Sequence, residues 1–231
     1  MHSRVFISLK LEARKIMVRV ALSYPKIPGS ERILPGKCIA FEKYDGTNLH
    51  WVWERELGWY AFGTRRNRFD LDEKGIAEFN AQHPGYEDAV HLFQTTYAGA
   101  LEKIFKENPA YKAEELSVFT EYFGPNSFAG LHKNSDRKEL MLFDVYNGTH
   151  MVDPEVFLQD FGHLKIAKVI YKGKLTGRFA NDVREGEFNV AEGVVCKGGT
   201  GSELWMVKIK TNAYMEKLKK AFSADWEKYW E

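Results

Sequence analysis

Residues 41–54 read FEKYDGTNLHWVWE, and this stretch decides the fold. Aromatic and β-branched residues on both sides of an Asp-Gly turn at 45–46 predict strands. From Leu49 to Trp53 every second residue is a large apolar side chain, which predicts a half-buried strand. The turn also places an amine, Lys43, beside a glycine, where a ligand can approach the backbone closely. Taken alone, an exposed lysine on a hairpin is the simpler interpretation.

The sequence on either side of this stretch predicts a single α+β domain with mostly antiparallel sheet. Apolar residues at three- and four-residue spacing predict a helix over 89–105. The other expected elements are strands at 117–123, 139–146, 191–197 and 204–210, a short helix after Asp153-Pro154, and an amphipathic helix over 213–231.

Composition excludes several classes of protein. The 231 residues carry 33 Lys+Arg against 32 Asp+Glu, so there is no basic tail and no acidic polyelectrolyte. With 44% hydrophobic residues the chain can bury a sizeable core. No apolar run suits a signal peptide or a membrane span, and Cys38 and Cys196 form no CxxC pair. We therefore expect a cytoplasmic domain at 17–231, preceded by an optional extension at 1–16.

Five segments place charged side chains where chemistry can use them. They are KYDG at 43–46, GTRRNR at 63–68, FTEYFG at 119–124, LMLFDVY at 140–146, and the pair EGVVCK at 192–197 and WMVKIK at 205–210. Each has a simpler interpretation, such as a solvated arginine cluster, a structural salt bridge or a plain core strand. Residues 208 and 210 share one strand face, whereas Glu192 and Lys197 share a site only if Glu192 begins its strand or the chain bends there.

In this order the segments resemble the motifs of the covalent nucleotidyltransferase superfamily, which comprises ATP-dependent polynucleotide ligases and mRNA capping enzymes. KYDG resembles the KxDG nucleophile motif, and TEYFG, LFDVY, EGVVCK and VKIK resemble the motifs that follow it. The resemblance covers residues 24–210. DNA ligases and capping enzymes usually carry Arg at the position of Asn48. That difference, and YPKIP at 24–28, resemble RNA ligases of the RNA ligase 2 type.

The resemblance implies a nucleotidyltransferase (ligase adenylation-domain) fold, with antiparallel sheets flanked by helices around a central nucleotide cleft. It also implies an ATP-dependent RNA ligase. Lys43 would attack the ATP α-phosphate to form lysyl–AMP. AMP would pass to an RNA 5′-phosphate, and a 3′-OH would displace it to seal the strand. The implied cofactors are ATP and Mg²⁺ or Mn²⁺, and the implied partner is RNA with such ends.

The resemblance also assigns residues. Glu121 would hold the ribose, Phe143 would stack on adenine, and Glu192 would bind the metal directly or through water. Arg65 is favoured over Arg66 as a phosphate contact. A lysine nucleophile must be unprotonated, and Lys208 and Lys210 are expected to lower its pKa. The implied catalytic residues are Lys43, Asp45, Lys208 and Lys210, and the implied nucleotide-binding residues are Glu42, Lys43, Asn48, Arg65, Arg66, Glu121, Phe143, Asp144, Glu192, Lys197, Lys208 and Lys210.

One feature departs from the family pattern. Only 21 residues follow Lys210, so we expect no appended oligonucleotide-binding or helical C-terminal domain. A partner protein that supplies the grip on the substrate is therefore a candidate. The alternatives are a minimal DNA ligase, a capping-type nucleotidyltransferase, and a non-catalytic module that binds nucleotides or RNA ends.

Overall fold

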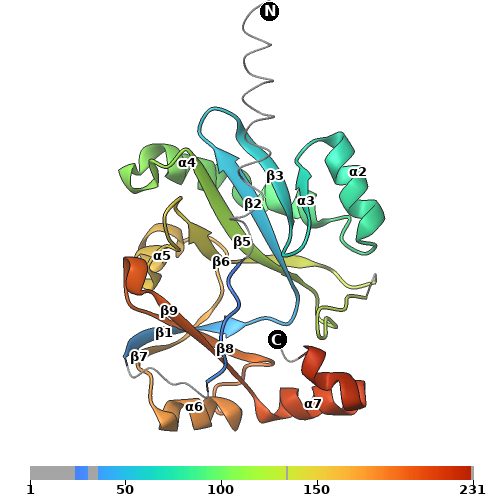
Figure 1. Ribbon diagram of the computed structural model, residues 1–231, viewed down its shortest axis with the longest axis vertical. Coiled ribbons are helices and arrows are strands. Elements are labelled where there is room, and N and C mark those ends of the chain that lie inside the picture. The colour runs from blue at the N-terminus through green and yellow to red at the C-terminus, as the bar shows by residue number, and fades with distance from the viewer. Residues whose placement is uncertain (1–23, 31–35, 134, 230–231) are drawn as a thin grey trace, which may run out of the picture.

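The computed structural model describes residues 24–30, 36–133 and 135–229, which form two antiparallel sheets with helices on their outer faces (Figure 1). The four-stranded sheet has the order β7-β1-β8-β9, with β7 at Val169–Lys174, β1 at Lys37–Lys43, β8 at Gly193–Gly198 and β9 at Trp205–Lys210. The five-stranded sheet has the order β4-β3-β2-β5-β6, with β4 at Arg68–Asp70, β3 at Gly58–Thr64, β2 at Thr47–Glu54, β5 at Glu115–Phe123 and β6 at Glu139–Tyr146. The predicted α+β class and ligase-type architecture are confirmed.

The Asp-Gly turn joins the two sheets and does not close a hairpin. β1 pairs with β7 and β8, whereas β2 pairs with β3 and β5, so the chain leaves one sheet at Lys43 and enters the other at Thr47. Gly46 is required there because a Cβ at this position would lie 2.3 Å from the carbonyl oxygen of Tyr122. The end of β1 is thereby held at the junction of the sheets.

The prediction that β2 is half-buried is wrong. His50 is 3% exposed and Val52 is 0% exposed, so both alternating sets of side chains are buried. Neighbouring strands cover both edges of β2, and the burial of both sets shows that both of its faces are covered as well. Its Trp51 ring stacks on Phe93 at 4.0 Å between ring centroids. Its indole N–H donates to the Thr120 hydroxyl at 2.9 Å.

A second core explains why charged side chains reach the interior between the sheets. On β1, β8 and β9, every second residue packs toward α6 (Gly177–Arg184), including Ala40, Cys196 and Ile209. Because side chains alternate along a strand, the intervening residues face the other way. These include Lys43, Lys197, Lys208 and Lys210.

Two of the predicted helices are present but differ from the prediction in continuity or length. The helix expected over 89–105 is present but is interrupted by a π-turn, and the C-terminal helix ends early and continues as a 3₁₀ turn. The elements missed from the sequence are β4, α2, β7 and α6. The helical segments are α2 (Glu73–Gln82), α3 (Ala89–Phe93), η2 (Gln94–Ala98), α4 (Gly99–Glu107), η3 (Pro109–Tyr111), α5 (Pro154–Phe161), α6, η4 (Gly201–Glu203), α7 (Asn212–Phe222) and η5 (Ser223–Tyr229).

Two further predictions concern the N-terminal extension and membrane-spanning segments. The proposed extension at 1–16 lies outside the described residues. Within the residues that the structure describes, no helix is long and apolar enough to cross a membrane.

We expect Trp51→Ala to lower the free energy of unfolding by about 3–5 kcal/mol, because it removes a fully buried ring from the main core. Thr120→Val keeps the shape but removes the acceptor of the indole N–H, and we expect it to cost about 1–3 kcal/mol. Urea unfolding followed by circular dichroism measures both changes. A loss below about 1 kcal/mol for Trp51→Ala would contradict the central position of β2.

Candidate functional site

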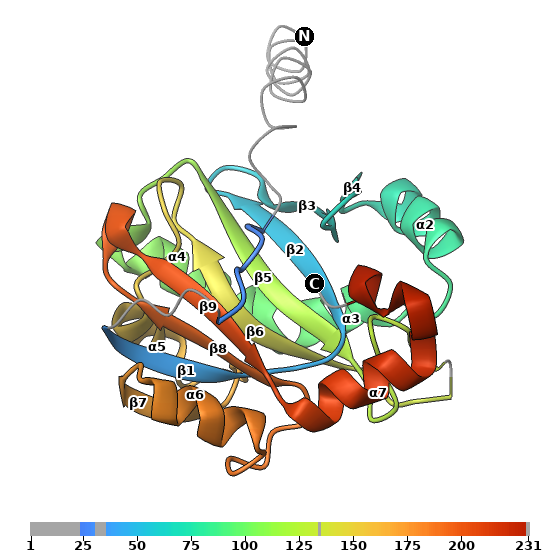
Figure 2. The same cartoon turned by 60° about the horizontal axis from the view of Figure 1, so that its bottom comes forward.

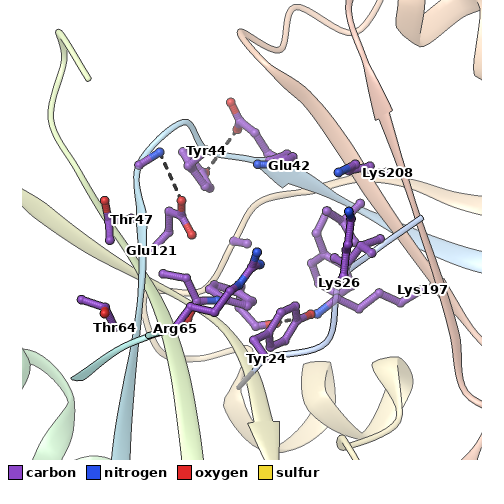
Figure 3. Close-up of a pocket in the computed structure, with 18 of the residues that line it drawn as sticks. Tyr24, Lys26, Glu42, Tyr44, Thr47, Thr64, Arg65, Glu121, Lys197 and Lys208 are labelled. Atoms are coloured by element: carbon purple, nitrogen blue, oxygen red, sulfur yellow. Dashed lines mark hydrogen bonds between the residues drawn. The ribbon is translucent and has the colours of Figure 1, made fainter. Parts of the chain in front are cut away.

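A cleft of about 420 Å³ lies between the two sheets and is rich in basic side chains (Figure 3). Residues of β1, β2, β5, β6, β8 and β9 line it, together with Tyr24, Lys26 and Ile27. Its basic lining side chains are Lys26, Lys43, Arg65, Arg66, Lys197 and Lys208, against the carboxylates Glu42 and Glu121. This excess of cations suits a polyanionic ligand.

Behind the wall of the cleft, one buried carboxylate joins two lysines. Glu192 is 2% exposed, and its Oε2 lies 2.8 Å from Lys43 Nζ while its Oε1 lies 3.0 Å from Lys210 Nζ. The strand register produces this group, because Gly193 pairs with Lys43 on one side and with Lys210 on the other. Glu192 directly precedes β8. It therefore lies at the start of its strand, which is a condition under which Glu192 and Lys197 were expected to share a site.

The protonation of Lys43 differs from the expectation. Burial lowers the pKa of its ammonium, but the carboxylates of Glu192 and Glu121 outweigh burial and raise the pKa above its usual value. In Lys210, burial outweighs Glu192 and lowers the pKa. The Glu192 carboxylate, whose position could not be predicted from the sequence, lies within contact distance of the Lys43 and Lys210 amines. Lys43 is therefore protonated near neutral pH in the chain without ligand.

Glu121 has no ion pair within 4 Å among the described residues. It accepts a hydrogen bond from the backbone N–H of Gly46 at 3.1 Å, so it contacts the turn that carries Lys43. Burial raises the pKa of its carboxyl to about 7, although Lys43 lowers it and Glu192 raises it further. Near neutral pH this side chain can either donate or accept a hydrogen bond.

Asp45 is not part of the cleft lining and anchors the turn that follows Lys43. Its Oδ2 accepts a hydrogen bond from the backbone N–H of Ala129 at 2.9 Å. Burial and the charge of Glu192 raise the pKa of its carboxyl, while Ala129 and the Tyr214 hydroxyl on α7 lower it. The C-terminal helix α7 therefore contacts the turn at residues 44–46, which also borders the cleft.

A buried polar network closes the other end of the cleft. Lys197 Nζ lies 2.8 Å from Asp144 Oδ2 and donates to the Phe143 carbonyl at 2.6 Å. The Tyr24 hydroxyl donates to the same Asp144 oxygen at 2.5 Å. Burial lowers the pKa of the Lys197 ammonium, and Asp144 only partly opposes this. This network links the two sheets through β8 and β6.

Most of the predicted site residues meet at this cleft. Those that line it are Glu42, Lys43, Asn48, Arg65, Arg66, Glu121, Phe143, Lys197 and Lys208. Asp45, Asp144, Glu192 and Lys210 are not part of the lining. Asp144 and Glu192 contact the lining residues Lys197 and Lys43, Lys210 contacts Glu192, and Asp45 lies in the turn after Lys43. The sequence reasoning missed Tyr24, Lys26 and Ile27 as lining residues, although it had noted YPKIP as a family-like segment.

A metal would have to rely on few protein ligands. Among the residues that the structure describes, no group of three His, Cys, Asp or Glu side chains could hold a metal ion. Glu192 is a buried carboxylate of the kind that Mg²⁺ prefers, and both of its oxygens contact ammonium groups. A cation on Glu192 would have to replace one of these ammonium groups, with phosphate oxygens and water as its other ligands.

The two-sheet fold and the basic cleft together define a nucleotidyltransferase-type domain. The family model for RNA ligases matches residues 36–210, and the chain belongs to this family. That range contains every predicted site residue. A comparison with curated protein sequences returns no match.

Solved structures share the fold. A variant of the Naegleria gruberi RNA ligase with ATP and Mn is 16% identical, with a TM-score of 0.56 over 84% of this chain and 58% of that one. An archaeal ATP-dependent RNA ligase is 17% identical, with a TM-score of 0.56 over 87% and 52%. A putative ATP-dependent DNA ligase from Aquifex aeolicus is 17% identical, with a TM-score of 0.54 over 89% and 56%. The chain thus spans little more than half the length of these proteins.

The raised pKa of Glu121 predicts a pH-dependent stability. The folded chain keeps this carboxyl protonated up to about pH 7, whereas the unfolded chain releases the proton near its ordinary value of 4.5. The folded state therefore loses stability as pH rises from about 5 to 8. Glu121→Gln removes this loss, so its stability relative to wild type should rise by on the order of 2 kcal/mol over that range.

Denaturant unfolding at a series of pH values measures this difference. Glu107→Gln, an exposed change on α4, is the matched control and should leave the pH dependence as in wild type. A pH-independent difference between Glu121→Gln and wild type would refute the raised pKa.

Proposed function

We propose that this chain is the adenylyltransferase domain of an ATP-dependent RNA ligase and that Lys43 is its nucleophile. The observation that carries the proposal is the position of Lys43. Its amine lies at the junction of the two sheets, on the wall of a basic cleft and 2.8 Å from the buried Glu192 carboxylate. Membership in the RNA ligase family supports the same assignment.

In the first step the Lys43 amine attacks the α-phosphorus of ATP. A nitrogen–phosphorus bond forms, the bond from the α-phosphorus to the bridging oxygen breaks, and pyrophosphate leaves. The product is lysyl–AMP. Attack requires a neutral amine, so the proton that Lys43 carries in the ligand-free chain must leave first. Glu192 Oε2 is a carboxylate oxygen within hydrogen-bond distance of that proton.

The basic side chains of the cleft stabilise charge on the phosphates. Lys208 lines the cleft and Lys210 lies behind it on the same face of β9, so both favour the negative charge that develops at the α-phosphate. Arg65 adds a forked donor from the turn after β3. Bound Mg²⁺ or Mn²⁺ would neutralise phosphate charge, with Glu192 as its protein ligand. The Naegleria relative, solved with ATP and Mn, is consistent with this requirement.

The end of the cleft at Phe143 suits the nucleoside. Phe143 lines it and meets the Tyr24 ring edge-on at 5.1 Å, which leaves a ring on which adenine can stack. Glu121 lies between this end and Lys43, and its carboxyl can bond a ribose hydroxyl in either protonation state. Asn48 pairs with Glu121 across β2 and β5 and also lines the cleft.

The later steps involve RNA. AMP would pass from Lys43 to a 5′-phosphate, and a 3′-OH would then displace AMP as the new phosphodiester forms. The match to this chain covers only 58% of the Naegleria gruberi chain and 52% of the archaeal chain. We therefore propose that part of the substrate grip comes from outside residues 36–210, from a further segment or a partner protein.

Two other functions compete with this one. A minimal DNA ligase or capping-type transferase would use the same cleft, and the Aquifex aeolicus neighbour has the same fold. A non-catalytic module would bind nucleotides or RNA ends without forming an adduct. The RNA ligase family match and Asn48 favour the RNA ligase, and the two experiments below separate the three.

We expect the purified chain to form a covalent adduct with ATP labelled at the α-phosphate when Mg²⁺ or Mn²⁺ is present. The phosphoramidate should be acid-labile and should form with ATP in preference to GTP. Lys43→Ala should abolish it, because Lys43 is the one lysine among the described residues that both contacts Glu192 and lines the cleft. Gel electrophoresis and phosphorimaging measure the product.

Lys37→Ala is the matched control, because Lys37 is an exposed lysine at the opposite end of the same strand. It should form the adduct at the wild-type level. No adduct with the wild type would refute the enzymatic proposal and favour a binding module. An adduct that persists in Lys43→Ala would refute the assignment of the nucleophile.

We also expect nicked duplex RNA or single-stranded RNA with a 5′-phosphate to accept AMP from the adenylylated protein. The measurement is the transfer of label to the 5′ end of each strand, with nicked DNA of the same sequence as the comparison. RNA should be adenylylated faster than DNA. Transfer to DNA alone would contradict the RNA assignment and favour the minimal DNA ligase.

A further inference from the structure

Residues 24–30, which we call the N-terminal strap, form one border of the cleft. The backbone N–H of Lys208 donates to the Pro28 carbonyl at 3.0 Å, and Gly29 forms a parallel bridge with Lys208. At the other end, the Tyr24 hydroxyl bonds Asp144 and lies 3.2 Å from the Met206 sulfur. Figure 2 shows the strap in dark blue, crossing β9. It is fixed at both ends.

Between these anchors, Lys26 lines the cleft, although no sequence motif of the family predicted a role for it. Figure 3 shows its side chain on the same side of the cleft as Lys208 and Lys197. The anchors named above consist of a tyrosine side chain and backbone groups, and none of them uses the Lys26 ammonium. A substitution of Lys26 can therefore test its charge without removing the anchors.

We propose that Lys26 binds the outer phosphates of the nucleotide and stabilises the leaving pyrophosphate. This inference rests on the proposed function. In phosphoryl and nucleotidyl transfer the attacking and leaving atoms lie roughly in line with the phosphorus. The pyrophosphate must therefore lie on the side of the α-phosphate that faces away from Lys43.

The register of the four-stranded sheet places both Tyr24, at the nucleoside end, and Lys26 beyond the level of Lys43, and of the two only Lys26 carries a charge that suits phosphate. Lys43 is level with Gly193 and Lys210, whereas Lys208 is level with Val195, one two-residue step further along the sheet. Each such step is roughly 6–7 Å. The strap contacts β9 at Lys208 and Met206, so Lys26 enters the cleft beyond the level of Lys43 and Lys210. A cation there can take up charge as pyrophosphate departs.

The test compares ligands that contain the outer phosphates with one that lacks them. Calorimetry on the full chain with Mg²⁺ measures the affinity for AMP, for pyrophosphate and for α,β-methylene-ATP, whose P–C bond prevents adduct formation. In Lys26→Gln we expect affinity for the triphosphate analogue and for pyrophosphate to fall about tenfold or more, because a charge-assisted contact is lost. AMP affinity should stay within about twofold of wild type.

Two variants complete the design. Lys26→Arg keeps the charge and should retain most of the affinity for the analogue and for pyrophosphate. Lys103→Gln removes an exposed lysine on α4 and should match wild type for all three ligands.

Three results would overturn the inference. Unchanged affinity of Lys26→Gln for the analogue and for pyrophosphate would exclude a phosphate contact. Equal losses for AMP and the analogue would instead assign Lys26 to the nucleoside end or to the folding of the strap. A wild-type chain that binds neither the analogue nor AMP would refute the proposed function itself, which distinguishes that failure from a failure of Lys26 alone.

Discussion

The site depends on one buried carboxylate that two lysines share. Glu192 binds Lys43 and Lys210 with its two oxygens, and it is almost fully buried while it does so. A buried ion pair is costly unless its geometry satisfies both charges, and removal of one partner leaves an uncompensated charge. The three residues therefore fix the position of one another. Because they come from β1, β9 and the start of β8, this interaction also fixes the end of each strand.

The alternation of side chains along the strands turns this local arrangement into a cleft. One face of the four-stranded sheet carries apolar residues that pack on α6, so its opposite face is left for lysines. The chain then crosses to the other sheet within three residues, at a glycine that lies too close to β5 for any Cβ. That crossing brings Glu121 next to the turn of Lys43. The same two cores that stabilise the fold thus enclose the charged groups between them.

The sequence was sufficient for the features that depend on neighbouring residues. The order of the motifs, the strands at 117–123 and 139–146 and the helix that opens at Pro154 all follow local patterns, and the structure contains them. Asp153 does not cap that helix with its side chain, which instead accepts a hydrogen bond from the backbone N–H of Gly201. The sheet switch at residues 44–46 was not predictable, because an Asp-Gly turn has the same local signature whether it closes a hairpin or joins two sheets. The raised pKa of Lys43 was missed for a similar reason. Its partner Glu192 lies 149 residues away, and only the fold brings the two together.

The net charge of +1 conceals two regions of opposite sign that lie close together. Around Lys43 and Lys210 lie the carboxylates of Asp45, Glu121 and Glu192, and burial and the charge of Glu192 raise the pKa of the first two. That corner has an excess of acidic groups, whereas the lining of the cleft beside it has an excess of cations. A polyphosphate that carries a divalent cation has the complementary pattern, with anionic oxygens for the basic wall and a cation for the acidic corner. A polyanion without a bound cation would complement only the basic lining of the cleft. This pairing of charges therefore favours a metal-bound nucleoside triphosphate over a simple anion as the ligand of the cleft.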